Sequence, residues 1–482
     1  MNLLECEPAN VFKIFRQISN IPRESDNEAQ ICNYLVDFAK AHGLEYYRDD
    51  SNNVIIKKPA SSGYEDFPTV ILQAHMDMVC VKREESNHNF LADPIDIIVD
   101  GDFIRAKDTS LGADDGIGLA IALAVLEEDL PSPNLEIVAT TAEEIGLVGA
   151  QALDKSQLSG NILINLDNST FGQLCVGSAG ALRIKISMPL EFENNKGDEI
   201  FSLKISGLLS GHSGDEINCE RANAIILLAR VLNEIKDDIF LFDISGGTKM
   251  NLIPNIACAN FSVRKENVPQ IKYLVGQMQD VFSKEFAETD KDIKISLESV
   301  NENVDHKKCL SKASLENLIS RILLTPNGII NMCLEMDDLP NTSNNLGVIE
   351  LSNDRVFFYA MVRSMTSSRK YLTADKIKLL FADSDIEILT DIPAWDFDSD
   401  SKLNEYLADI YENIFESAPQ IMAIHGGLEC NCFADKVKNL VSIGADIFNL
   451  HTVNEHCNIK SVQKLWKFVC TVLQDARLKN LA

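Results

Sequence analysis

Residues 71–78 read ILQAHMDM. A mainly apolar run that is typical of a buried strand is followed directly by His75 and, two residues later, by Asp77. Carboxylates recur beside apolar segments in three further stretches: LGADDG (111–116), TTAEEIG (140–146) and ILINLDN (162–168). A buried charge is unfavourable unless it is paired or bound to a metal. The pattern therefore indicates that a positive partner balances these side chains in the folded chain.

The length and composition are those of a globular protein that is too long for one ordinary core. The chain has 482 residues, 45% of them hydrophobic and 24% charged, which suggests two domains or one domain with a large insertion. A formal charge of −28 argues against nucleic acid or an anionic membrane as a partner. We find no signal peptide, membrane span or disulfide framework, and expect a soluble cytoplasmic protein with reduced thiols.

Apolar periodicity predicts an α/β sheet at both ends of the chain and an inserted domain between them. Buried strands are expected at 69–74, 135–141 and 161–166, with helices at 28–43 and 116–128. Alternating strands then follow at 183–188, 199–208, 256–263 and 355–362, with a helix at 222–235. A last apolar strand is expected at 440–451, ending at His451. We therefore predict an α/β domain over 1–182 and 393–482, with a mixed, largely parallel sheet, interrupted by an α+β domain over 183–392.

Polar residues at the predicted strand ends form a candidate metal site. Ligands of α/β sheets collect at the carboxyl ends of strands. The candidates are His75, Asp114, Glu143, Glu144, Asp167 and His451. No Lys or Arg occurs in 109–128 or 130–154 to neutralise the acids locally, so a divalent cation is the economical explanation.

Two histidines with several carboxylates suit zinc, and also manganese or cobalt. Two ions sharing one carboxylate are the usual arrangement of two-metal hydrolytic sites. We expect Asp114 to be the shared ligand, because a glycine-flanked turn lets both oxygens face outward. Asp77 is expected to hold the second ring nitrogen of His75. Glu143 and Glu144 cannot project the same way, so one can bind metal while the other reaches the water.

Each motif also has a simpler interpretation. His75 could be a hydrogen-bonded core histidine, and the DDG sequence at 114–116 a turn with a helix cap. Glu143 and Glu144 could lie on a solvated face, Asp167 in an Asx turn, and His451 in a surface loop. The full set in this order is more specific than any of its members.

The sequence resembles the M20 metallopeptidase family, and within it the aminoacyl-histidine (Xaa-His) dipeptidase group. The similarity runs almost from end to end. It rests on VFKIFRQISNIPRESDNE, HMDMV, LGADDGIGLA, TTAEEIGLVGA, GLLSGHSGDEI, GGTKMNLIP, VRSMTSS, GGLEC and the H-x-x-x-E at 451–455. The resemblance implies a zinc-peptidase-like catalytic domain interrupted by a lid domain.

Carried over motif by motif, the resemblance also implies residue roles. His75, Asp114 and Asp167 would bind one ion, and Asp114, Glu144 and His451 the other. Glu143 would be the general base, and Asp77 the acid that orients His75.

The resemblance implies substrate contacts in the lid as well. His212 would contact the substrate carboxylate or the oxyanion, and Arg363 would bind a free C-terminal carboxylate. Asn251 would lie between them. A turn residue for His212 and a surface ion pair for Arg363 are the structural alternatives. The lid motif has Asp215 and Asn218 where the family often has glycine and histidine.

These observations predict a two-metal dipeptidase acting on small dipeptides, including Xaa-His dipeptides. An N-acyl amino acid deacylase of the same family would share every metal ligand. A non-catalytic, metal-stabilised binding module is a third alternative, which the presence of Glu143 disfavours. The oligomeric state is left open, with a homodimer among the alternatives.

Overall fold

The computed structural model describes residues 3–300 and 307–481. The chain forms two compact units. The first comprises Met1–Gly177, Phe397–Ala423 and Leu428–Ala482. The second comprises Ser178–Asp396 and Ile424–Gly427. The main segment of the second unit thus runs from Ser178 to Asp396, whereas the sequence analysis placed the inserted domain at 183–392. Residues 424–427 also belong to the second unit.

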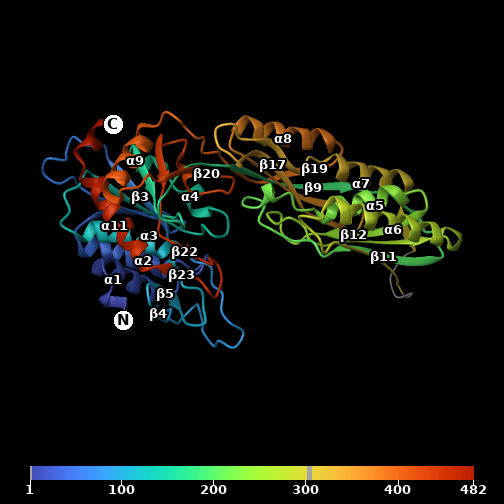
Figure 1. The fold of residues 1–482 in the computed structure, drawn as a ribbon, viewed down its shortest axis with the longest axis horizontal. Helices are drawn as coiled ribbons and strands as arrows, with labels where there is room; N and C mark the ends of the chain where they lie inside the picture. Colours follow the sequence, from blue (N-terminus) through green and yellow to red (C-terminus); the bar gives the residue numbers. More distant parts are fainter. Residues whose placement is uncertain (1–2, 301–306, 482) are drawn as a thin grey trace. The chain divides into compact units, whose positions relative to one another are not determined.

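The first unit is an α/β structure built on a mixed sheet (Figure 1). Its strands are β1 (Glu45–Arg48), β2 (Val54–Lys58), β3 (Val70–His75), β4 (Ile97–Asp100), β5 (Phe103–Ala106), β6 (Leu135–Thr140), β7 (Ile162–Asn165), β8 (Gln173–Ser178), β20 (Gln420–Ile424), β21 (Asn439–Ser442), β22 (Ile447–Phe448) and β23 (His456–Asn458). Its helices are α1 (Ala9–Ser19), α2 (Ala29–Ala41), α3 (Ala113–Glu127), α4 (Val148–Ala152), α9 (Lys402–Phe415), α10 (Cys430–Phe433) and α11 (Ile459–Gln474).

The centre of this sheet is parallel, and its flanks are antiparallel. The strand order is β1-β2-β6-β3-β7-β21-β8-β20. β3 runs parallel to β6 and β7, and β21 runs parallel to β7, whereas β2 and β8 pair antiparallel with β6 and β21. Every residue of β3, β6 and β7 is buried, as expected for strands covered on both faces. The carboxyl ends of these parallel strands therefore meet at one edge of the sheet.

One strand prediction is wrong. The run 440–451 is not a single strand ending at His451, because β21 ends at Ser442 and the two-residue β22 belongs to a separate four-stranded sheet with β23, β5 and β4. The chain leaves β21 where Gly444 passes against Asn168, so closely that a Cβ on Gly444 would lie 1.5 Å from the Asn168 carbonyl oxygen. His451 lies in a loop, with a φ of 60°.

The second unit is an antiparallel sheet with helices packed on it (Figure 1). Its strands are β9 (Gly180–Pro189), β10 (Phe192–Asn194), β11 (Glu199–Ser206), β12 (Ile239–Gly246), β13 (Ala257–Val263), β14 (Lys294–Ser299), β15 (Lys308–Leu310), β16 (Gly328–Met332), β17 (Pro340–Ser352), β18 (Arg355–Ser364) and β19 (Asp385–Ile392). Its helices are α5 (Ala224–Ile235), α6 (Val268–Glu285), α7 (Lys312–Leu324) and α8 (Ser367–Leu380). The predicted change from a buried, partly parallel sheet to an alternating antiparallel one is confirmed.

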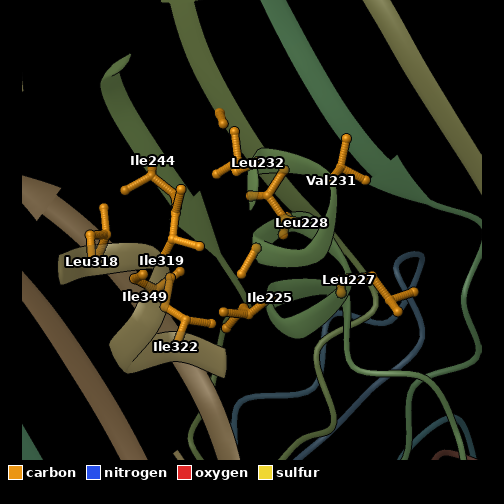
Figure 2. Packing of buried hydrophobic residues seen from close by; sticks show 14 of the residues in the cluster. Ile225, Leu227, Leu228, Val231, Leu232, Ile244, Leu318, Ile319, Ile322 and Ile349 are labelled. Carbon is orange, nitrogen blue, oxygen red and sulfur yellow. The ribbon is translucent and has the colours of Figure 1, made fainter. Parts of the chain in front are cut away.

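The core of the second unit lies between its helices and one face of its sheet. In β9, Leu182, Ile184 and Ile186 are buried, while the residues between them are partly exposed. Figure 2 shows Ile225 and Leu228 of α5 close to Ile319 and Ile322 of α7, with strand side chains beside them. The alternating pattern of the sequence therefore marks the buried face of this sheet.

We expect Leu228→Ala to destabilise the second unit by about 2–5 kcal/mol, because it removes a fully buried side chain and leaves a cavity. The matched control is Leu324→Ala on α7, whose side chain is 67% exposed and whose effect should stay within about 0.5 kcal/mol. Urea unfolding of the full chain measures both. Equal midpoint shifts would contradict the assignment of this core.

Candidate metal centre

His75 ends β3 and faces two carboxylates. Its ring is 1% exposed. The Nε2 atom lies 3.0 Å from Asp114 Oδ1 and 3.5 Å from Asp167 Oδ1. The Nδ1 atom lies 3.4 Å from Asp77 Oδ1, on the other side of the ring. A strand buried on both faces thus holds this histidine between acids from three segments of the chain.

Asp114 lies between two histidines at the start of α3. Its Oδ1 atom faces His75, and its Oδ2 atom lies 3.2 Å from His451 Nε2. Burial acts to raise the pKa of Asp114, but hydrogen bonds with His451 and His75 outweigh it and hold the pKa well below its usual range. The backbone at Asp114 is not helical, and the Asp114–Asp115 peptide bond is cis. The distances show that the two oxygens of Asp114 face two different partners.

His451 also contacts Glu144. Its Nε2 atom lies 3.0 Å from Glu144 Oε2. Hydrogen bonds with Asp114 and Glu144 raise the pKa of His451 to about 10. The other oxygen of Glu144, Oε1, is buried and has no hydrogen-bond partner among the described residues. One oxygen of Glu144 thus remains available to a further ligand.

Asp77 anchors the segment that carries both glutamates. Its Oδ1 atom accepts a hydrogen bond from the main-chain N–H of Glu143 at 3.1 Å, and Oδ2 accepts one from Glu144 at 3.3 Å. The Ser25 hydroxyl donates to Oδ2 at 2.7 Å. Asp77 is therefore placed to fix the ring of His75 and the backbone of the two glutamates at the same time.

The two remaining acids of the site are held at raised pKa values. Burial raises the pKa of Asp167 to about 8, despite the opposing effect of His75. Burial, together with the charges of Asp167 and Glu144, raises the pKa of Glu143 well above its usual value. The positive charge of His75 therefore does not offset the effect of burial on these two pKa values.

This donor set fits divalent cations. Ligand atoms of His75, Asp114 and Glu144 all lie within 4.8 Å of one another. The ion pairs found for Asp114, Asp167 and Glu144 are with the two histidines alone, in the part of the chain that the structure describes. Imidazole and carboxylate together suit zinc, manganese and cobalt. A bound cation would supply the positive charge that the buried acids lack.

The sequence did not point to two residues that border this site, Arg23 and Glu455. Both are almost fully buried and contact the turn before Asp114. The only available signals were their motifs, IPRES (21–25) and the H-x-x-x-E at 451–455, and neither motif shows what its residue contacts.

In the second unit, His212 and Arg363 lie together. Arg363 Nη2 is 3.4 Å from His212 Nε2, and His212 Nδ1 is 2.9 Å from Asp215 Oδ2. Arg363 is 4% exposed, and its Nε atom has no hydrogen-bond partner among the described residues. Burial lowers the pKa of Arg363 to about 10, and the charge of Asp215 opposes this. A buried guanidinium with an unused donor is suited to binding an anion.

The cluster also contains His425, which the sequence did not point to. His425 Nε2 lies 2.7 Å from Ser343 Oγ. Burial and the charge of Arg363 lower the pKa of His425 to about 3, so this imidazole is neutral. Asn251 is nearby through its main chain, because its carbonyl oxygen accepts a hydrogen bond from the Ser213 N–H at 2.8 Å. In the part of the chain that the structure describes, no hydrogen bond joins the Asn251 side chain to His212 or Arg363.

Comparison with known proteins identifies the family. The family model described as peptidase family M20/M25/M40 matches residues 71–475. The chain belongs to this family. It is 35% identical over 485 residues to the cytosol non-specific dipeptidase of Escherichia coli (strain K12), with 99% of each chain covered.

A solved structure agrees over the whole chain. The aminoacylhistidine dipeptidase from Vibrio alginolyticus superposes with a TM-score of 0.87 at 32% identity, covering 98% of both chains. A probable succinyl-diaminopimelate desuccinylase of Staphylococcus aureus (strain MRSA252) is 24% identical over 285 residues, or 52% of this chain and 66% of its own. The predicted M20 membership and the α/β fold with an inserted α+β domain are confirmed.

We expect Asp114→Asn to lower the content of bound zinc, because an amide nitrogen replaces one of the two oxygens that face the histidines. Asp115→Asn is the matched control. Asp115 is also buried, but its Oδ1 atom accepts from the Gly118 N–H, a bond that asparagine preserves. Metal analysis of the purified proteins measures both, and full metal content in Asp114→Asn would contradict a ligand role for Asp114.

Proposed function

We propose that this peptidase is a two-metal dipeptidase that hydrolyses small dipeptides, including Xaa-His dipeptides. The observation that supports it best is Asp114, whose two oxygens face two histidines. The full-length similarity to a non-specific dipeptidase and to an aminoacylhistidine dipeptidase supports the substrate class. We further propose a cytoplasmic location, as the name of the Escherichia coli relative suggests. Among the described residues, no helix combines the length and apolar character needed to cross a bilayer.

We propose that His75, Asp114 and Asp167 hold one divalent ion, and that Asp114, Glu144 and His451 hold the second. Zinc is favoured, with manganese and cobalt as alternatives. When bound, such ions lower the pKa of a water molecule and polarise the scissile carbonyl. Asp77 contributes by keeping the ring of His75 in one orientation.

In this proposal Glu143 is the general base. It takes the proton from the attacking water and later gives it to the leaving amine. Burial raises the pKa of its carboxyl, and a positive charge at the site would lower it toward neutrality, where a base is most effective. The hydrogen bond from the Glu143 N–H to Asp77 fixes the backbone from which this side chain extends.

For the second unit we propose recognition of the substrate's C-terminal carboxylate. Arg363 offers a buried guanidinium with an unused donor. His212 and Asn251 are proposed as further substrate contacts. Asp215 Oδ2 lies 2.9 Å from His212 Nδ1 and so favours the tautomer with a proton on Nδ1.

Glu143→Gln should lower kcat on dipeptides by about 10²–10⁴-fold, because the amide cannot take a proton. Its metal content should remain that of the wild type. Glu144→Gln is the matched variant and should lose metal instead, with partial recovery on adding zinc. Metal stoichiometry and turnover are measured side by side. A Glu143→Gln protein that loses metal and recovers with zinc would mean that the two glutamates have exchanged roles.

Arg363→Ala should lower kcat/KM on dipeptides on the order of 10–100-fold, because a hydrogen bond to a charged group contributes about 1.5–3 kcal/mol. The corresponding C-terminal amides should lose much less. The control is Arg355→Ala, because Arg355 lies on β18 as Arg363 does but forms a partly exposed ion pair with Asp385 of β19. Equal losses on both substrates would exclude carboxylate recognition by Arg363. N-acetylated dipeptides in the same assay separate a dipeptidase from a deacylase.

A further inference from the structure

The turn that leads to Asp114 is held on its N–H side by Glu455. Glu455 Oε2 accepts hydrogen bonds from the main-chain N–H groups of Leu111 at 2.7 Å and Gly112 at 2.9 Å. Glu455 Oε1 accepts one from Ala113 at 2.8 Å, with the Asp114 N–H at 3.4 Å. The side chain is 3% exposed. One carboxylate thus satisfies consecutive donors at the start of α3, which also favours a negative charge there.

The same turn is held on its carbonyl side by Arg23. Arg23 Nη2 donates to the Gly112 carbonyl oxygen. Arg23 Nη1 donates to the carbonyl oxygens of Met76 at 3.1 Å and Asp77 at 2.8 Å. The residue is 2% exposed. A single guanidinium therefore ties the turn to the segment that directly follows His75.

The glycines of the LGADDG motif make room for this guanidinium. A Cβ on Gly112 would lie 2.4 Å from Arg23 Nη2, and one on Gly116 would lie 2.7 Å from the same atom. Gly112 also has a φ of 68°, which a residue with a side chain rarely adopts. The two glycines therefore allow Arg23 to lie close to the backbone, and Gly112 also allows the turn.

The two charges compensate each other across the turn. Burial lowers the pKa of Arg23, and the charge of Glu455 is the largest of the influences that oppose it. Breaking one partner of such a buried arrangement leaves the other charge uncompensated. Arg23 and Glu455 therefore act on the turn as a pair.

We propose that Arg23 and Glu455 are positioning residues of the metal centre. Arg23 fixes the turn before Asp114 against the end of β3, which carries His75. Glu455 fixes the same turn against the loop that carries His451. The two residues thereby set where the two oxygens of Asp114 point, without touching substrate. The inference rests on the proposed metal-dependent function.

The first test compares Glu455→Gln with Glu136→Gln. Glu136 is the matched control, because its buried carboxylate also accepts hydrogen bonds from main-chain N–H groups, those of Ser159 and Gly160. It lies near the start of β6, whereas the candidate metal centre lies at the carboxyl ends of the parallel strands. Glutamine retains the shape but loses one acceptor oxygen in each case. Zinc affinity is measured by competition with a chelator, and thermal unfolding is measured on the metal-free proteins. We expect Glu455→Gln to weaken zinc binding by about 10–100-fold and Glu136→Gln to leave it unchanged.

The second test compares Arg23→Lys with Lys58→Met. Lysine keeps the charge, but its single nitrogen cannot reproduce the fork that spans three carbonyl oxygens. Lys58 donates to the carbonyl oxygens of Val125 at 3.1 Å and Glu128 at 3.0 Å, at the other end of α3. We expect Arg23→Lys to weaken zinc binding and lower kcat on dipeptides with little change in KM. Lys58→Met should lower only the unfolding temperature.

Zinc affinities that stay at the wild-type value in both Arg23→Lys and Glu455→Gln overturn the proposal. The proposal is also overturned if Glu136→Gln and Lys58→Met weaken zinc binding as well, and if the loss of zinc affinity in all four variants follows the drop in unfolding temperature. If the wild-type protein binds zinc but hydrolyses no dipeptide, the proposed substrate is wrong. The zinc affinities of Arg23→Lys and Glu455→Gln then still test whether the two residues position the metal ligands. A wild-type protein that binds no zinc, manganese or cobalt refutes both.

Discussion

The contact of Asp114 with two histidines is the constraint on which the rest of the first unit depends. The two oxygens of one carboxylate face His75 and His451, which are far apart in the sequence. Such an arrangement is unfavourable in a buried site unless the surrounding chain fixes every partner. The parallel strands fix His75, and the turn at the start of α3 fixes Asp114. The loop after β22 fixes His451.

The insertion of the second unit does not disturb this arrangement, because the first unit closes its sheet with segments from both ends of the chain. β21, which follows the insertion, pairs in parallel with β7, which precedes it. His451 and Glu455 reach the site from the same C-terminal part. The residues of the candidate metal centre all lie in the first unit, and those of the anion-suited cluster around Arg363 all lie in the second.

The two clusters differ in their electrostatics in a way that suits two tasks. Acids predominate in the cluster of the first unit, where burial raises the pKa of Asp167 to about 8, so a bound cation would stabilise the charged forms of these acids. A buried arginine predominates in the second, where the neighbouring His425 is neutral because its pKa is lowered to about 3. The first environment is suited to activating water, and the second to binding a carboxylate.

The sequence by itself determined the buried strands β3, β6 and β7, the antiparallel character of the insertion, and the acids and histidines that gather at the sheet edge. It could do so because these features depend on local periodicity and on which residues follow each apolar run. Only the tertiary structure decided that His451 lies in a loop, that Asp215 pairs with His212, and that Arg23 and Glu455 hold the turn before Asp114. The Glu455 contacts join residues 341 to 344 positions apart, and no local pattern specifies contacts of that range. They follow from the packing of whole elements, which sets side-chain direction at the strand ends.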